Sequence, residues 1–219
     1  MRAEYDARID SRVVALVVEG YELGPAATNC YVVRVDRGAA EAVVIDPGEN
    51  AAELRLEFAR PNARCAAILI THGDIDHIGG VADLAEATGA SVYGPARGRI
   101  PAERLAWYPF REYTVDVELE GGETLELAGI EFEVLAIPGH SPDHLAFAAD
   151  GALFSGDLLF ANGVGRVDVP GGDWEALLES VRSLAERFPP ETTIYPGHGR
   201  PTTLGAEQER NPFLAELRA

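Results

Sequence analysis

The stretch Ala66–Gly80, AAILITHGDIDHIGG, contains the pattern from which the fold and the chemistry can be inferred. Its first five residues, Ala66–Ile70, are all apolar, which predicts a buried β-strand. The strand leads directly into Thr71–His77, where two histidines and two aspartates stand close together: His72, Asp74, Asp76 and His77. Imidazoles and carboxylates at the end of a rigid strand favour a metal site, and this mixture of ligands suits zinc, iron or manganese.

Three further residues of the same kinds follow apolar runs that end in a glycine-containing turn: His140, Asp157 and His198. One histidine in a turn is weak evidence, because most such residues are solvated or hydrogen-bonded. Several histidines and a carboxylate cluster at successive strand ends are difficult to explain as coincidence. Cys30 and Cys65 form no Cys-x-x-Cys pair, which argues against a structural zinc site. The sequence therefore predicts a metal centre built from loops.

Short apolar strands alternate with helices along the chain. We expect strands at residues 13–18, 30–35, 42–45, 66–70, 91–93, 113–119, 124–127, 131–137, 145–149, 152–154 and 192–195. We expect helices at 50–60, 81–87 and 173–188, the first capped by Asn50 and the last by Asp173, and a short helical tail. Each half of the chain runs strands first and a helix afterwards. This order favours two sheets packed face to face with helices outside, as one domain over residues 1–219.

The composition excludes several classes of protein. Acidic residues outnumber basic ones by 36 to 18, giving a net charge of −18, and every basic residue is arginine. Without lysine, neither a Schiff base nor a P-loop lysine is available. The negative charge argues against binding to nucleic acid or an anionic membrane. The apolar runs are too short to span a bilayer and residues 1–12 do not resemble a signal peptide, so we expect a soluble, cytoplasmic protein.

The ordered set of motifs resembles the metallo-β-lactamase-fold hydrolases, and most nearly the glyoxalase II-like (hydroxyacylglutathione hydrolase-like) branch. The motifs are Thr71–His77, Gly139-His140, Ser155-Gly156-Asp157 and Pro196-Gly197-His198. The resemblance implies an α+β fold, a four-layer αββα sandwich with a metal site at one edge of the two sheets. It further implies that one or two divalent metal ions activate a water as hydroxide for the hydrolysis of a small thioester or related acyl ester.

The resemblance also assigns the ligands. His72 and His140 would bind a first metal; Asp76, His77 and His198 would bind a second; and Asp157 would bridge them. Asp76 and Asp157 are the two ligands to which we assign catalytic roles. Cys30 is interpreted as a core residue.

Asp74 departs from the family pattern, which has a second histidine at this position. One interpretation is that Asp74 only turns the loop after Gly73. The other is that its carboxylate binds the first metal, which would favour iron or manganese over zinc, because carboxylates are harder ligands than imidazole. The flavodiiron branch of the superfamily, with an acidic residue here and bound iron, supports the second interpretation. A centre in which only the second metal is held tightly is a third possibility.

Asp74 also keeps two other functions open: an iron-dependent redox enzyme, flavodiiron-like or sulfur dioxygenase-like, and a non-catalytic metal-binding protein with a degenerate site. Against the first, no flavodoxin-like segment is present. The thiol carrier of a thioester substrate stays open, because the short segment after His198 carries no lysine with which to hold glutathione.

Three polar residues have open roles beside the expected ligands. His144 either contacts a ligand or substrate or makes a structural hydrogen bond. Asp46 is a candidate for orienting a ligand histidine. Arg166 either pairs with a substrate carboxylate or braces its own loop, and we favour the brace.

Overall fold

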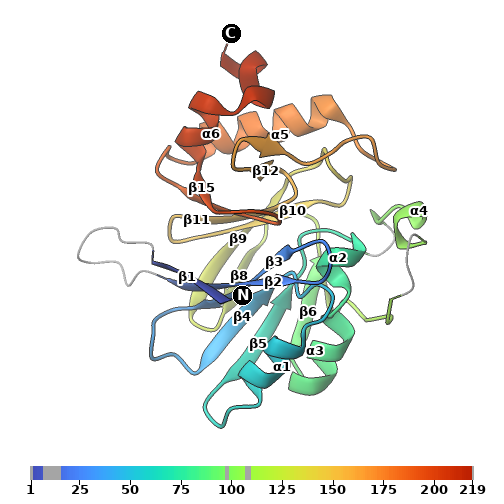
Figure 1. Cartoon of the computed structure of the whole chain (residues 1–219), viewed down its shortest axis with the longest axis vertical. Coiled ribbons are helices and arrows are strands. Elements are labelled where there is room, and N and C mark those ends of the chain that lie inside the picture. Colours follow the sequence, from blue (N-terminus) through green and yellow to red (C-terminus); the bar gives the residue numbers. More distant parts are fainter. Residues whose placement is uncertain (1, 7–15, 97–98, 107–109, 219) are drawn as a thin grey trace.

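Two β-sheets lie face to face, and helices cover their outer surfaces (Figure 1). The structure is a computed structural model that describes residues 2–6, 16–96, 99–106 and 110–218. Helices α1 (Ala52–Phe58) and α3 (Val81–Thr88) lie outside the first sheet, while α5 (Trp174–Arg187) and α6 (Leu204–Arg210) lie outside the second. This arrangement confirms the expected αββα sandwich.

The first sheet contains seven strands in chain order, antiparallel from β1 to β4 and parallel from β4 to β7. Its strands are β1 (Arg2–Asp6), β2 (Val17–Leu23), β3 (Thr28–Arg34), β4 (Glu41–Ile45), β5 (Arg64–Leu69), β6 (Ser91–Pro95) and β7 (Val117–Leu119). The short helices α2 (Ile75–Ile78) and α4 (Ala102–Leu105) occupy connections beside this sheet.

The second sheet contains six strands in the order β15-β14-β11-β10-β9-β8. Its strands are β8 (Thr124–Leu127), β9 (Ile130–Ala136), β10 (Leu145–Ala149), β11 (Ala152–Gly156), β14 (Thr193–Pro196) and β15 (Thr202–Thr203). A separate two-stranded ribbon joins β12 (Leu159–Phe160) to β13 (Gly163–Val164), and 3₁₀ turns follow α6 over Pro212–Arg218.

The central strands are buried on both faces, which explains their uninterrupted apolar sequences. In β5, Ala67 and Leu69 face the core between the sheets, whereas Ile68 packs in the core beneath α1 and α3. A third core lies between the second sheet and α5. These three layers of packing hold the strand ends, and the loops that follow them, in fixed positions.

Some expected boundaries were wrong. The first helix begins at Ala52 after an Ala51 cap, because Asn50 adopts a left-handed conformation (φ 60°) and its carbonyl accepts from the Ala52 amide. The strand expected at 113–119 is limited to β7, because Asp116 instead exchanges hydrogen bonds with Val92 through its amide and its carboxylate. Residues 13–15 of the expected strand 13–18 lie outside the described residues.

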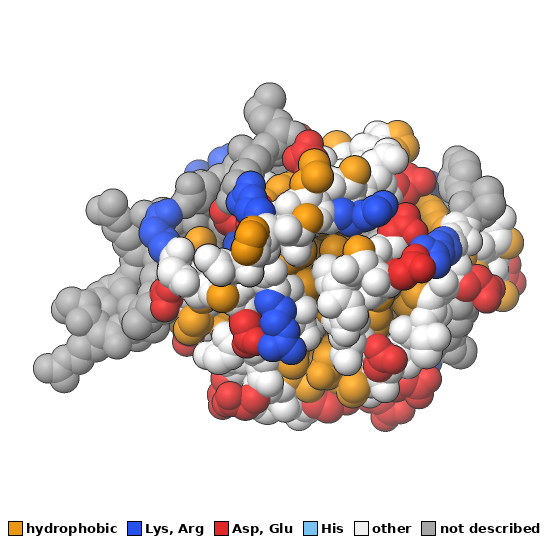
Figure 2. All heavy atoms as spheres, turned by 90° about the horizontal axis from the view of Figure 1, so that it is seen from below, with side chains coloured by type: hydrophobic (Ala, Val, Ile, Leu, Met, Phe, Trp, Pro, Cys, Tyr) orange, Lys and Arg blue, Asp and Glu red, His pale blue; other side chains and the backbone are white. Residues whose placement is uncertain are grey.

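Arginine side chains stand among acidic ones on the face drawn in Figure 2. Within the described residues, no helix combines the length and the apolar character needed to cross a membrane.

Candidate metal centre

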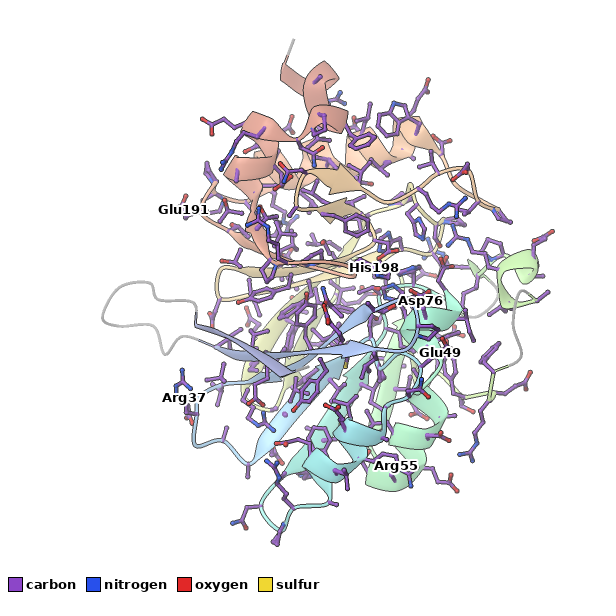
Figure 3. The ribbon with its side chains drawn as sticks, viewed as in Figure 1. Arg37, Glu49, Arg55, Asp76, Glu191 and His198 are labelled. Atoms are coloured by element: carbon purple, nitrogen blue, oxygen red, sulfur yellow. The ribbon has the colours of Figure 1, made fainter. Side chains whose placement is uncertain are left out.

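The expected ligands meet at one edge of the sandwich, where loops from both halves are hydrogen-bonded to each other. The Leu145 amide donates to the Thr71 carbonyl (2.7 Å), and the Asn29 amide donates to the Gly197 carbonyl (2.7 Å). In Figure 3, Asp76 from α2 and His198 from the loop after β14 lie next to each other across this boundary. The metal-ligand loops are therefore joined by main-chain contacts between the two halves.

Six of the seven expected ligands form two groups whose ligand atoms lie within 4.8 Å of one another. One group is His72, His140 and Asp157; the other is Asp76, His77 and His198. This is the division that the resemblance implies, with Asp157 between the two groups: its Oδ1 lies 3.3 Å from His77 Nε2 and its Oδ2 3.9 Å from His140 Nε2. Asp74 stands outside both groups.

Asp46 fixes the orientation of two of these histidines. Its Oδ2 lies 2.9 Å from His77 Nδ1, so this nitrogen carries the proton and Nε2 presents a lone pair in the neutral ring. Oδ2 also accepts from the Thr71 hydroxyl (2.7 Å), and Oδ1 accepts from the Thr71 amide (2.8 Å). Since that hydroxyl has donated its hydrogen, it accepts from His72 Nδ1 (2.9 Å), and His72 Nε2 presents a lone pair as well.

His140 is oriented in the same way by the main chain. Its Nδ1 donates to the Arg166 carbonyl at 2.7 Å, so Nε2 is the lone-pair nitrogen. The Arg166 side chain is exposed and pairs with Asp168. The contribution of Arg166 to the site is thus its carbonyl group, and its side chain braces the loop.

The residues present fit a metal ion. His72 Nε2, His77 Nε2 and Asp157 Oδ1 are buried and have no hydrogen-bond partner among the described residues. An ion held tetrahedrally at about 2.1 Å from each ligand atom places those atoms roughly 3.4 Å apart. In the second group, His77 Nε2 lies 3.6 Å from Asp76 Oδ2, and His198 Nε2 lies 3.3 Å from that oxygen and 3.5 Å from Asp157 Oδ2.

The carboxylates and histidines shift one another's pKa values. Burial opposes ionisation of Asp157 and Asp76, but the neighbouring histidines outweigh it and hold the pKa of both carboxyls below the usual range. Burial likewise lowers the pKa of His198, yet its hydrogen bonds to Asp157 and Asp76 raise it to about 9. Burial also lowers the pKa of His77, but the negative charges of Asp157, Asp76 and Asp46 outweigh it and raise that pKa well above the usual value. A cation is therefore favoured here, and protons compete with metal for the same nitrogen atoms.

His144 positions Asp157 and does not face solvent. It is 1% exposed, and its Nε2 accepts from the Asp157 amide at 3.2 Å. Burial and the nearby His72 and His140 lower the pKa of His144, so the ring is neutral. Of the roles open in the sequence, the structure shows a contact with an expected ligand residue, through the Asp157 amide.

Asp74 caps nothing with its side chain, although its carbonyl accepts from the His77 and Ile78 amides at the start of α2. Its Oδ2 lies 3.1 Å from His140 Nε2 and 3.7 Å from His72 Nε2, and its Oδ1 contacts Arg104 Nη1. The side chain therefore faces the metal centre, and the interpretation of Asp74 as a turn residue alone is wrong.

Two residues at the centre escaped the sequence analysis. Thr28 Oγ1 donates to Asp76 Oδ2 at 2.7 Å, and Arg104 pairs with Asp74. Neither belongs to a motif. The one signal for Arg104 is indirect, because a carboxylate placed in a buried loop requires a partner of opposite charge.

Comparison with known proteins places the chain in a family. The Metallo-beta-lactamase superfamily profile matches residues 23–198, and the chain belongs to this superfamily of metal-binding proteins, most of which are hydrolases. It is 33% identical over 202 residues to hydroxyacylglutathione hydrolase GloC of Haemophilus influenzae, covering 85% of this chain and 92% of that protein.

Two solved structures are similar over almost their whole length. BLEG-1 B3 metallo-beta-lactamase is 35% identical with a TM-score of 0.82, covering 90% of this chain and 99% of that one. TTHA1623, solved in a di-iron-bound form, is 41% identical with a TM-score of 0.76, covering 89% and 99%.

Proposed function

We propose that this protein is a metal-dependent hydrolase of a thioester or a related acyl ester. The observation that carries the proposal is a set of buried atoms without partners among the described residues, His72 Nε2, His77 Nε2 and Asp157 Oδ1, which all belong to the two ligand groups at the edge of the sandwich. Unpaired polar atoms are costly inside a protein, so their convergence indicates a bound cation.

Cys30, Ser141 and Ser155, three described residues that could act as nucleophiles, are engaged elsewhere. Cys30 is fully buried in the core, and burial raises the pKa of its thiol well above the usual value. The hydroxyls of Ser141 and Ser155 donate to Asp143 and to the Leu159 carbonyl. Water is therefore the attacking group. A bound divalent ion lowers the pKa of a coordinated water toward neutrality and polarises an acyl carbonyl.

One side of the centre is accessible to a substrate. The His72 and His77 side chains are 0% exposed, whereas those of His198 and Asp76 are 30% and 22% exposed. The partly exposed Phe160 ring lies edge-on to His198, with centroids 5.9 Å apart. We infer that an acyl group approaches over His198 and Asp76 with its apolar part against Phe160.

Thr28 and Asp46 keep the charged side chains in place during this reaction. The Thr28 hydroxyl donates to Oδ2 of the more exposed Asp76. Asp46 accepts from His77 Nδ1, on the side of the ring opposite the ligand nitrogen Nε2. The likeness to GloC supports a thioester as the substrate class. The likeness to TTHA1623, solved in a di-iron-bound form, supports iron as a candidate for the resident metal. Zinc and manganese are the other candidates.

The proposal is tested with acyl thioesters of glutathione, coenzyme A and a small thiol, together with an oxygen ester and a lactone. Metal-loaded protein should release thiol or acid from at least one of them. Chelation should abolish this activity, and added metal should restore it. Hydrolysis that survives removal of metal to trace levels contradicts the proposal. So does an iron-loaded protein that hydrolyses none of these compounds but consumes oxygen with a persulfide, which would support the redox alternative.

A further inference from the structure

A buried ion pair lies beside the first ligand group. Arg104 in α4 has a side chain that is 0% exposed, and its Nη1 contacts Asp74 Oδ1. Its Nε donates to the Pro170 carbonyl (2.9 Å), and its Nη2 donates to the His140 carbonyl. With all three nitrogens engaged, this guanidinium is fixed in position and is not available to a substrate. Arginine keeps its proton under all ordinary conditions, so the charge is permanent.

The guanidinium competes for a ligand atom of the first group. His140 Nδ1 is committed to the Arg166 carbonyl, so any metal would have to use His140 Nε2. That atom already lies 3.2 Å from Arg104 Nη1, within hydrogen-bond distance. A metal bound there would also lie close to a buried positive charge, and like charges repel strongly where water is excluded.

Asp74 is neutralised by the same contact. Its Oδ1 contacts Nη1 of the Arg104 guanidinium, which carries a permanent positive charge and whose side chain is 0% exposed. The Asp74 carboxylate thus needs no metal to balance its charge.

Among the described residues, no arginine pairs with the second ligand group. His77 Nε2 has no hydrogen-bond partner there, and neither has Asp157 Oδ1, which lies between the two groups, 3.3 Å from His77 Nε2. The neighbours of the group's ligand atoms that carry charge are its own carboxylates and histidines. The two groups therefore differ in one respect: a buried guanidinium lies beside a ligand atom of the first group and not beside those of the second.

We propose that the Asp74–Arg104 ion pair takes the place of the first metal. The protein then holds a single ion tightly, with Asp76, His77, His198 and Asp157, and Arg104 supplies a fixed positive charge beside His140. This inference rests on the metal centre of the proposed function. It separates the chain from TTHA1623, which was solved with two irons.

The test counts metal ions without substrate. Metal-free protein is loaded with excess zinc, and in parallel with manganese; free metal is removed, and metal per chain is measured by elemental analysis and calorimetric titration. Wild type should retain one ion per chain. The double variant Asp74→His/Arg104→Gln should retain two, because an imidazole replaces the carboxylate, the competing cation is gone, and no unpaired charge is left buried. Arg104→Gln alone should strengthen binding of the additional ion, at the first ligand group, at least tenfold.

Arg111→Gln is the matched control. It removes the same group from an exposed ion pair with Asp83 and Glu86, and it should leave one ion per chain. Two tightly bound ions in wild type, or one ion in the folded double variant, would overturn this inference and leave the proposed function intact. No metal in wild type would overturn the metal centre itself, and with it the proposed function.

Discussion

Asp157→Ala should leave a folded protein that retains little metal and has a kcat/KM lower by at least about 10²–10³-fold. Asp157 lies between the two groups, with Oδ1 3.3 Å from His77 Nε2 and Oδ2 3.5 Å from His198 Nε2. Among the ion pairs of the described residues, Asp157 is the carboxylate that contacts histidines of both ligand groups. Its loss removes both a ligand and the negative charge that favours a cation. Elemental analysis and steady-state kinetics on the same preparation measure the two effects.

Asp46→Ala is the comparison. Asp46 contacts His77 and Thr71 and faces no metal position, so its removal misorients a ligand and should cost about 10–100-fold in metal affinity or activity. Metal loss should therefore be greater for Asp157→Ala. Equal loss in two equally folded variants would mean that Asp157 does not bind the metal.

The second large effect is expected from Gly197→Ala. A Cβ at this position would lie 2.2 Å from Asp157 Oδ1 and 2.7 Å from His77 Cε1, one atom from each ligand group. The backbone cannot move away easily, because the Gly197 amide donates to Gly156 and its carbonyl accepts from Asn29. We expect metal affinity to fall on the order of 10–100-fold, as for other changes that displace ligands.

Gly163→Ala serves as the control for this substitution. Its Cβ would make ordinary contacts with Phe160 at 3.7 Å, so metal affinity should be unchanged. Thermal unfolding of both loaded and metal-free proteins separates a local effect on the centre from a general loss of stability. A folded Gly197→Ala protein with wild-type metal affinity would show that the ligands are not arranged as described.

Local patterns were sufficient to predict the elements that carry strong signals. The helix expected at 173–188 forms over Trp174–Arg187, and Asp173 caps it by accepting from the Ala176 amide (2.9 Å). The hairpin around Asp150-Gly151 also forms between β10 and β11. In contrast, Asn50 failed as a cap because it adopts a left-handed conformation and its carbonyl accepts from the Ala52 amide, which the local sequence does not reveal.

The grouping of the candidate metal ligands could be predicted because each one follows an apolar strand, and the edges of two packed sheets bring strand ends together. Arg104 could not. It belongs to an unremarkable short helix and meets Asp74 and His140 only through the tertiary fold, from 30 and 36 residues away. The departure at Asp74 pointed to an altered metal site, but the pairing of Asp74 with Arg104 is visible only in the structure.

The central claim is that hydrolysis depends on metal held by Asp76, His77, His198 and Asp157. The most direct measurement is thioester hydrolysis and metal content on the same samples, after graded removal of metal by a chelator. We predict that activity falls in proportion to the metal bound and vanishes with it, while the protein stays folded. Activity that stays constant as the metal content falls to zero would contradict the account.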